Sequence, residues 1–318
     1  MNKKVAVVIP SYKVKKSILS VISEIGEEVS KIYVVDDACP ERSGEFVKAN
    51  CKDKRVEVLF NPENSGVGGA TITGFKKALE DEVDIVIKLD GDGQMNPKLI
   101  PTLIAPLLSG SADYVKGNRF FHLESLKEMP LVRLIGNAGL SFISKAASGY
   151  WNLMDPTNGY IAIDAAVLKF LPLEKINKRF FFESDLLFRL NTIRAVVREV
   201  PMDAVYKDET SNLNVFQSLV TFPLQYLRCF IKRIFYTYFL RGFGVCSLEI
   251  ILGSVLFGFG FIYALYHWCL GMSRGIPSPT GTVMLAAIMM IFGFQLLLAA
   301  VLFDMQNIPE EPLVKILK

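Results

Sequence analysis

Two long uncharged apolar stretches near the end of the sequence limit most strongly what this chain can fold into. Residues 281–303, GTVMLAAIMMIFGFQLLLAAVLF, contain no charged side chain. Residues 250–266, IILGSVLFGFGFIYALY, are also uncharged, and the apolar character continues to Leu270. At about 1.5 Å per residue, helices of this length cross a bilayer core of about 30 Å. We therefore predict two transmembrane helices; buried helices of a soluble core are the alternative.

The distribution of Lys and Arg predicts the orientation of these helices. Basic residues flank the pair on its outer sides, whereas the short connecting segment carries only Arg274. By the positive-inside rule, we expect an integral protein of the plasma or inner membrane, with the large N-terminal part and both termini in the cytoplasm. The flanking residues are Arg228, Lys232, Arg233 and Arg241 before the pair, and Lys315 and Lys318 after it.

Residues 223–240, PLQYLRCFIKRIFYTYFL, directly precede the apolar stretches and have helical periodicity. Residues 206–244 carry five Lys/Arg and two Asp/Glu, a net charge of +3 that equals that of the whole chain. A basic amphipathic helix at this place indicates binding in the membrane interface rather than to nucleic acid. An ordinary helix on the globular core is the alternative. The apolar stripe is Leu224, Leu227, Ile231, Ile234, Phe235 and Tyr238, and the opposite stripe is Gln225, Arg228 and Lys232.

The N-terminal half of the chain alternates strand patterns with helix patterns. Such alternation predicts a mostly parallel α/β sheet with helices on both faces. The strands are expected at 4–10, 31–37, 55–61, 83–90 and 112–120, and the helices at 15–29, 42–51, 70–81, 131–149 and 179–193. We expect four parts in the chain: a globular α/β domain (1–210), juxtamembrane amphipathic helices (211–244), a two-helix transmembrane hairpin (245–304) and a cytoplasmic tail (305–318).

Polar residues follow each of the first four predicted strands. Ligands of parallel α/β sheets bind beyond the carboxyl ends of the strands, so these residues should gather at one edge. They are Pro10-Ser11-Tyr12, Asp36-Asp37, Asn61-Pro62 and Asp90-Gly91-Asp92. The sequence has only two histidines, His122 and His267, and five cysteines without paired spacing. Catalysis is therefore expected to depend on carboxylates, cations and a metal ion.

The segment DGDGQ, residues 90–94, is the strongest candidate for a metal site. Asp-Gly also marks hairpin turns, but the following residues 94–108 have helical spacing. A calcium EF-hand loop is excluded, because Met95 and Pro101 occupy the positions that need glycine and an acid. Two aspartates one residue apart at a strand end can reach one hard cation, and Gln94 offers an amide oxygen. We predict a Mg²⁺ or Mn²⁺ site formed by Asp90, Asp92 and Gln94.

Six segments of the first 165 residues together resemble the family-two glycosyltransferases of GT-A (Rossmann-like) fold. They are, in the family order, VVIPSY, VVDDACP, NSGVGGATITGF, KLDGDGQMNP, GNRF and DPTNGYIAID. Within this family the chain looks like the polyprenyl-phosphate glycosyltransferases, which include dolichol-phosphate mannose synthases and bactoprenol glucosyltransferases. Its two-helix tail matches the bactoprenol type. The resemblance implies transfer of a sugar from a nucleotide sugar to a polyprenyl phosphate.

The resemblance also implies roles for residues at the sheet edge. Pro10, Tyr12 and Asp37 would contact the nucleotide, with Asp36 nearby, while Asp90, Gly91, Asp92 and Gln94 would hold the metal and the diphosphate. Glycines 66, 68 and 69 let the backbone approach the nucleotide and begin a helix whose N-terminus favours anions. A plain loop-to-helix start is the alternative for these glycines.

The acceptor side is expected to depend on Arg119 and Arg133. Arginine holds phosphate in a bidentate fork, and family members place two arginines at this spacing against the lipid phosphate, with Asn137 one turn further on. Surface arginines are the alternative. A phosphomonoester is largely dianionic near neutral pH, so its oxygen can attack without a strong general base. Glu183 and Asp185 lie where many family enzymes place such a base; a helix-start pair is the alternative.

The expected reaction is an inverting, Mg²⁺- or Mn²⁺-dependent transfer in which Asp90, Asp92, Arg119 and Arg133 carry the catalysis. Dolichol-type enzymes have an arginine-and-glycine motif near residues 205–213 that is absent here, with Lys207 as its substitute. This departure favours glucose from UDP-glucose over mannose from GDP-mannose. The alternatives are another lipid acceptor, such as a diacylglycerol, and a non-catalytic membrane subunit that binds nucleotide sugar. The small transmembrane bundle is also compatible with a homo-oligomer.

Overall fold

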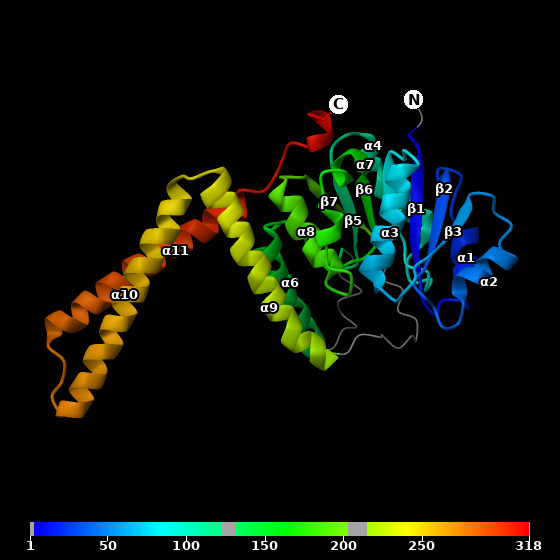
Figure 1. The fold of residues 1–318 in the computed structure, drawn as a ribbon. Helices are drawn as coiled ribbons and strands as arrows, with labels where there is room; N and C mark the ends of the chain where they lie inside the picture. The colour runs from blue at the N-terminus through cyan, green and yellow to red at the C-terminus, as the bar shows by residue number, and fades with distance from the viewer. Residues whose placement is uncertain (1–2, 122–130, 203–214, 318) are drawn as a thin grey trace. The chain divides into compact units, whose positions relative to one another are not determined.

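The computed structural model describes residues 3–121, 131–202 and 215–317, without the side chains of residues 131–138 and 215–220. The chain forms two compact units, residues 1–230 with 309–318 and residues 231–308. The strands of the first unit are β1 (Val5–Ser11), β2 (Lys31–Asp36), β3 (Val56–Phe60), β4 (Ile85–Lys88), β5 (Tyr114–Asn118), β6 (Ile161–Asp164) and β7 (Val197–Pro201). Its helices are α1 (Ile18–Ser23), α2 (Ser43–Asn50), α3 (Val67–Glu80), η1 (Pro97–Leu99), α4 (Ile100–Leu108), α6 (Leu131–Ser148), α7 (Ala165–Leu168), η2 (Leu173–Lys175), α8 (Phe182–Thr192) and η4 (Leu313–Lys315). Helix α9 (Val215–Ile234) continues into the second unit, which holds η3 (Phe235–Arg241), α10 (Val245–Arg274) and α11 (Thr280–Gln306) (Figure 1).

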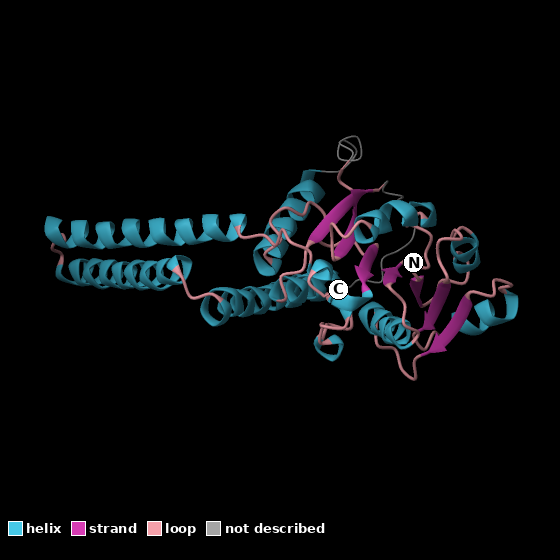
Figure 2. Ribbon diagram, turned by 90° about the horizontal axis from the view of Figure 1, so that it is seen from above, coloured by secondary structure: helices cyan, strands magenta, loops and turns pink. Residues whose placement is uncertain are grey.

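The seven strands form one sheet in the order β3-β2-β1-β4-β6-β5-β7. Strands β1 to β4 are parallel to one another, and β5 is parallel to β7. Only β6 among these strands runs antiparallel, to both of its neighbours. Figure 2 shows the strands as a twisted row with helices along both faces. The predicted α/β sheet is thereby confirmed, and the first four strands end at the same edge.

The main core lies between the middle strands β1, β2 and β4 and the helices α1 and α4. The helix expected over residues 15–29 is limited to α1, because the chain turns at Gly26, where Val29 N donates to the glycine carbonyl. This turn brings Ile25 and Val29 into the core. The Asp90-Gly91-Asp92 segment leads into η1 and α4, as the helical spacing predicts, and not into a hairpin.

Helix α9 has two different faces. Tyr226 and Cys229 are buried against α6 and α8, in a cluster with Ala147, Phe181 and Phe188. On the other side of the helix, Leu224 and Leu227 are exposed. An amphipathic helix with one face on a domain and an exposed apolar face is suited to the surface of a bilayer. The packing of one face on the globular unit is therefore observed, and binding of the other face in a membrane interface remains a prediction.

Helices α10 and α11 form an antiparallel hairpin that is long and apolar enough to cross a membrane, with mean hydropathies of 2.1 and 2.5 over their most apolar segments. Figure 2 shows them side by side along their length. Their contact follows small buried residues at seven-residue intervals, while the large apolar side chains around them are exposed. Close packing through small residues is typical of helix pairs in lipid. The small residues are Cys246, Gly253 and Gly260 on α10 and Ala286, Gly293 and Ala300 on α11.

A buried ion pair lies in the second unit. Arg233 Nη1 and Nη2 donate to the two carboxylate oxygens of Asp304 at 2.6 and 2.8 Å, and Tyr238 Oη donates to Asp304 at 2.6 Å. Arg233 is only 1% exposed. The pair joins the end of α9 to the end of α11, so Arg233 is not one of the exposed cations that the charge distribution suggested.

The C-terminal segment belongs to the first unit. Asp113, which is fully buried just before β5, accepts hydrogen bonds from Leu313 N and Val314 N, both at 2.9 Å. The same carboxylate accepts from Val196 N at 2.7 Å. Val314 is itself buried. A single carboxylate therefore fastens residues 313–314 to the sheet.

Candidate active site

A cavity of about 530 Å³ opens at the carboxyl ends of β4 and β5. Both polar and apolar residues line it, and the apolar ones include residues of α6 and α9. The polar and charged residues are Lys88, Asp90, Asp92, Gln94, Arg119, Thr157, Asn158, Glu183, Ser184 and Tyr226, and the apolar ones include Met95, Leu140, Phe180, Met202 and Phe222. The sheet edge thus brings the predicted residues Asp90, Asp92, Gln94 and Arg119 to one cavity.

Lys88, the last residue of β4, was not predicted as a site residue. Its side chain is 1% exposed, and its Nζ lies 3.0 Å from Asp90 Oδ1 and 3.1 Å from Glu183 Oε1. Burial opposes the charge on this amine, but Asp90 and Glu183 outweigh that effect and hold the pKa of Lys88 above its usual value. A lysine in an otherwise aliphatic strand was the sequence signal that could have identified it.

Glu183 and Asp185 have different environments. Glu183 lines the cavity and contacts Lys88. Asp185 is outside the lining, where it accepts from Asn177 N at 2.7 Å and pairs with Arg189 at 3.1 Å. Asp185 therefore fixes the segment before α8, and Glu183 is the one of the two that can meet a ligand.

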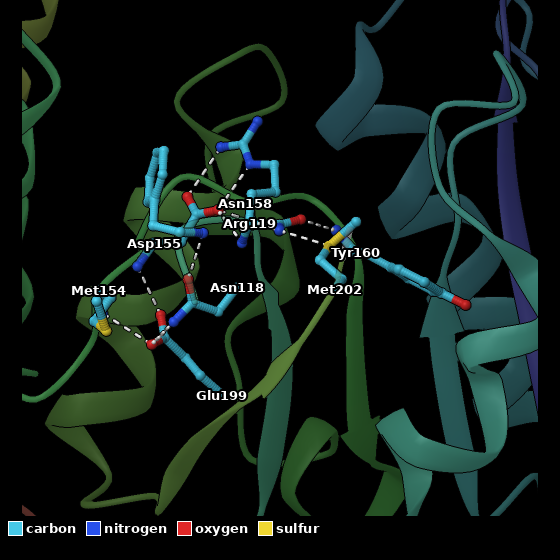
Figure 3. Close-up of polar contacts among 9 residues, drawn as sticks. Asn118, Arg119, Met154, Asp155, Asn158, Tyr160, Glu199 and Met202 are labelled. Carbon is cyan, nitrogen blue, oxygen red and sulfur yellow. Dashed lines mark hydrogen bonds and ion pairs between the residues drawn. The ribbon is translucent and has the colours of Figure 1, made fainter. Parts of the chain in front are cut away.

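Arg119 follows β5 and is held in place by Asp155, as Figure 3 shows. Arg119 Nε and Nη2 donate to the two Asp155 oxygens at 2.7 and 2.9 Å. Asp155 is fully buried, which alone would raise its pKa, but the hydrogen bonds and charge of Arg119 lower the pKa below the usual value. The Arg119 side chain remains about one-third exposed at the cavity wall. The ion pair therefore fixes the direction of a guanidinium group that reaches the cavity.

A second carboxylate, that of Glu199, fixes the backbone that carries Asp155. Glu199 of β7 accepts from Asp155 N at 2.8 Å, from Met154 N at 2.9 Å and from Asn118 Nδ2 at 3.0 Å (Figure 3). Burial raises the pKa of Glu199. Asp155 and Glu199 were both missed by the sequence interpretation, because the residues that bind them are distant in sequence.

The other predicted acceptor residues lie in α6. Arg133 and Asn137 are in this helix, but their side chains lie outside the described part of the structure. Lys207 also lies outside the described residues. Their predicted roles remain predictions.

Apart from Asp90, the residues predicted to bind the nucleotide lie at or after the carboxyl ends of β1 to β4, outside the lining of the cavity. Asp36 is buried and accepts from Cys39 N and Gly44 N at 2.7 and 2.6 Å. Asp37 accepts from Gly66 N at 2.7 Å. Both carboxylates therefore shape the loops around the edge. The other predicted residues here are Pro10, half-buried at the end of β1, Tyr12, whose ring lies 5.4 Å from Lys13 Nζ, and Gly91, whose carbonyl accepts from Ser17 Oγ at 2.7 Å.

The predicted glycine-rich segment packs against the chain before α8. Gly66 has a φ of 85°, a conformation that favours glycine. A Cβ at Gly66 would lie 2.8 Å from Lys178 O, and Gly69 N donates to the same carbonyl at 2.8 Å. Close backbone packing explains these glycines; their predicted contact with a nucleotide remains a prediction.

Comparison with known proteins decides the family. Residues 6–171, about half of the chain, match glycosyl transferase family 2. The chain belongs to this family. It is 32% identical over 221 residues to the UDP-N-acetylglucosamine–dolichyl-phosphate N-acetylglucosaminyltransferase of Methanococcus voltae, covering 65% of this chain and 88% of that protein. It is 30% identical over 209 residues to the undecaprenyl-phosphate mannosyltransferase of Micrococcus luteus, covering 64% and 85%.

Solved structures give the fold of this family 2 chain. Glucosyl-3-phosphoglycerate synthase from Mycobacterium tuberculosis, solved with UDP, superposes with a TM-score of 0.54 at 19% identity, covering 73% of this chain and 80% of that one. The same enzyme has been solved with Mn²⁺, UDP-glucose and phosphoglyceric acid, with a TM-score of 0.53 at 18% identity over 73% and 79% of the two chains. The GT-A fold expected from the resemblance is confirmed.

The residues at the end of β4 fit a divalent cation. No three His, Cys, Asp or Glu side chains among the described residues form a complete metal-binding group. Mg²⁺ is commonly held by one or two carboxylates together with substrate phosphates, and such a site does not need a third acid. Asp90 and Asp92 line the same cavity, beside the Gln94 side chain. This donor set of oxygens is the type that Mg²⁺ and Mn²⁺ prefer.

Lys116 is a second lysine on the face of the sheet that carries Lys88. Ile161 of β6 pairs with Lys88 on one side and with Lys116 on the other, so both side chains point to the same face. Lys116 is fully buried, and its Nζ has no hydrogen-bond partner in the described part of the chain. Burial lowers the pKa of Lys116 to about 8, although Asp155 and Glu199 favour the charged form.

The pKa of Lys116 predicts how stability changes with pH. Above about pH 8 the folded chain loses this proton, whereas an unfolded lysine keeps its proton up to about pH 10.4. The unfolded chain then binds more protons, so the free energy of unfolding rises with pH through this window. Lys116→Met should remove the rise and stabilise the protein at pH 7 by roughly 3 kcal/mol. Thermal unfolding of both proteins from pH 7 to 10 measures this, and parallel curves would contradict it.

Proposed function

We propose that this chain transfers a monosaccharide from a nucleotide sugar to a polyprenyl phosphate at the cytoplasmic face of a membrane, with inversion at the anomeric carbon. The observation that carries the proposal is the single cavity that joins a donor side, formed by Asp90, Asp92 and Gln94, to an acceptor side, where Arg119 and Glu183 lie. The names of the two relatives, which act on dolichyl phosphate and undecaprenyl phosphate, support the acceptor class.

The charge of the cavity supports a cation-assisted reaction. Among the described residues that line the cavity, Arg119 is paired with Asp155, and the remaining charged side chains are the base Lys88 and the acids Asp90, Asp92 and Glu183. A nucleotide diphosphate is itself anionic and would be repelled by this excess of carboxylates. When bound, a divalent cation supplies the positive charge that stabilises the departing diphosphate. In this proposal Asp90, Asp92 and Gln94 hold the cation.

In the proposed transfer, the main task of the protein is to orient the acceptor phosphate toward the anomeric carbon of the sugar. An oxygen of the acceptor phosphate forms a bond to the anomeric carbon, while the bond from that carbon to the diphosphate oxygen breaks. A phosphomonoester with a second pKa of about 6 is already an anion at neutral pH, so no proton has to be removed. Arg119, with Arg133 of α6, would hold that phosphate in a bidentate fork. Orientation of two reactants by such contacts accounts for a large part of many rate enhancements.

The membrane segments complete the proposal. The hairpin of α10 and α11 spans the bilayer, and the exposed apolar residues of α9 lie in its interface, so that the lipid phosphate can reach the cavity from the membrane surface. We propose the division into a catalytic domain (1–210), juxtamembrane helices (211–244), hairpin (245–304) and cytoplasmic tail (305–318). A homo-oligomer is compatible with this arrangement.

Transfer of labelled sugar tests the function. The purified protein with Mn²⁺, undecaprenyl phosphate and radiolabelled UDP-glucose, the donor favoured by the sequence, should form a lipid-soluble product. UDP-N-acetylglucosamine and GDP-mannose are tested as further donors, because the two relatives are named as an N-acetylglucosaminyltransferase and a mannosyltransferase. No lipid-soluble label from any donor would refute the proposal. Label only on an added diacylglycerol would instead support the other lipid acceptor, and a non-catalytic subunit would label neither.

Substitution of Asp92 tests the proposed cation site. Asp92→Asn keeps the shape of the side chain but removes its charge, and should lower transfer by at least about a hundred-fold. Initial rates of label transfer measure this effect. Glu80→Gln, at an exposed acid at the end of α3, is the control and should transfer at the normal rate. Normal turnover of Asp92→Asn would exclude the acid from the site.

A further inference from the structure

We propose that Lys88 is a positioning residue of the transfer reaction: its buried ammonium group ties Asp90, on the donor side of the cavity, to Glu183, on the acceptor side, and keeps both carboxylates in place. The inference rests on the proposed function, which gives the two sides of the cavity their roles. It adds a residue that acts through Asp90 and Glu183.

The contacts of Lys88 are specific to these two acids. The Nζ atom is 3.0 Å from Asp90 and 3.1 Å from Glu183, and the side chain is 1% exposed. The rest of β4, Ile85 to Ile87, is aliphatic and fully buried. Burying an ammonium group there is costly unless it is paired, and an apolar side chain would often give a more stable strand. The charge at this position is therefore better explained by the carboxylates it holds than by stability.

Gly159 is a second residue that fits this arrangement. A Cβ at Gly159 would lie 2.5 Å from Lys88 Nζ, 3.1 Å from Glu183 Oε1 and 3.3 Å from Asp90 Oδ2. The space that a side chain would fill is thus taken by the three charged groups themselves. Any larger residue at this position must displace the ammonium group or one of the acids.

The arrangement has a consequence for each side of the cavity. On the donor side, one oxygen of Asp90 is fixed by Lys88, which limits the directions in which the carboxylate can meet a cation. On the acceptor side, Lys88 compensates the charge of Glu183, so that an anionic phosphate meets less repulsion there.

Binding of the product nucleotide tests this role without turnover. Titration calorimetry gives the Kd of UDP and of GDP in the presence of Mn²⁺ for the wild-type protein, Lys88→Met and Lys116→Met. A complex of Mn²⁺ with a nucleoside diphosphate keeps a net negative charge, so loss of a nearby cation and of the fixed Asp90 both weaken it. We expect Lys88→Met to raise the Kd about ten-fold or more. Lys116→Met, the same change on the same face of the sheet, should leave it unchanged.

Two further variants separate positioning from general stability. The effect of Glu183→Gln on the Kd should differ by about three-fold or more between the wild-type protein and the Lys88→Met background, because Lys88 is the link between the two acids. Gly159→Ala keeps all three charged residues but occupies their space, and should also raise the Kd. An effect of Glu183→Gln that is equally large with and without Lys88 would overturn the link.

The outcomes distinguish the two proposals. If the wild-type protein binds neither nucleotide, the proposed function fails and this inference fails with it. If the wild-type protein binds and Lys88→Met binds equally well, the role of Lys88 is overturned while the function stands. Circular dichroism shows whether Lys88→Met is folded; if it is not, an unchanged Kd for Gly159→Ala overturns the role in its place.

Discussion

Replacing Asp155 by alanine is expected to lower the free energy of unfolding of the first compact unit by about 3–5 kcal/mol. Asp155 is fully buried and accepts both guanidinium hydrogen bonds of Arg119. Its removal leaves the partly exposed Arg119 without this counter-ion, and it also removes one of the two acceptors of the Asn158 side-chain amide. Thermal unfolding of the variant measures the loss. If Arg119 binds the acceptor phosphate as proposed, the KM for polyprenyl phosphate should rise more than the KM for the donor.

Two other variants show whether the effect comes from burial. Asp155→Asn keeps an oxygen that can accept from Arg119 but removes the charge, so its loss of stability should be intermediate. Glu174→Ala removes the exposed ion pair with Lys76, and exposed pairs contribute little. An Asp155→Ala protein that unfolds like Glu174→Ala would show that the ion pair with Arg119 is dispensable.

Replacing Gly293 by leucine is expected to destabilise the hairpin of α10 and α11 by about 3 kcal/mol or more. A Cβ at Gly293 would lie only 2.8 Å from Phe257 Cα, which is backbone and cannot move aside without separating the helices. Helix pairs in lipid depend on close backbone approach through small residues, since apolar burial gives no preference for the partner helix over the lipid. Thermal unfolding in detergent micelles measures the change in the hairpin.

The same hairpin contains a matched control. Gly258 lies on α10, and a Cβ there has no atom within 4 Å. Gly258→Leu introduces the same side chain into the hairpin, but on α10 and away from the contact with α11. This variant should therefore melt at the wild-type temperature. Equal melting temperatures for Gly293→Leu and Gly258→Leu would contradict the packing of α10 on α11.

The parts of the fold that depend on local periodicity could be predicted from the sequence. Parallel strands buried on both faces appear as short aliphatic runs such as IVIK, and long uncharged runs such as residues 281–303 predict the apolar helices. The antiparallel direction of β6 could not be predicted in this way, because direction depends on which strands pair and not on the composition of residues 161–164. The early end of α1 depends on how Ile25 and Val29 reach the core.

The candidate site was predictable where its residues share a short segment. Asp90, Asp92 and Gln94 lie within five residues, so the spacing itself indicated one site, and all three line the cavity. Asp155 and Glu183 are distant in sequence from the residues they contact. The packing of α8 brings Glu183 to Lys88, and Glu199 of β7 binds the backbone of Asp155, which contacts Arg119. For Asp36, the sequence showed an acid at a strand end but could not show that backbone N–H groups already occupy its oxygens.

Lys88 shows most clearly what was overlooked. In the strand predicted at 83–90, its position two residues before Asp90 places both side chains on the same face, because side chains alternate along a strand. A charged residue there must have a partner if the strand is buried, so a partner acid across the sheet edge could have been sought. The identity of that acid, Glu183, still required the structure.

The attachment of residues 313–314 to Asp113 affects how the first compact unit can be produced by itself. A protein cut after residue 230 to obtain a soluble enzyme would lose the buried side chain of Val314 and two of the three backbone donors that satisfy Asp113. The exposed acid and the apolar hole would then favour aggregation, although every residue of the candidate site is kept. A shortened enzyme that replaces residues 231–308 with a polar linker and keeps the last ten residues should be the better-behaved sample.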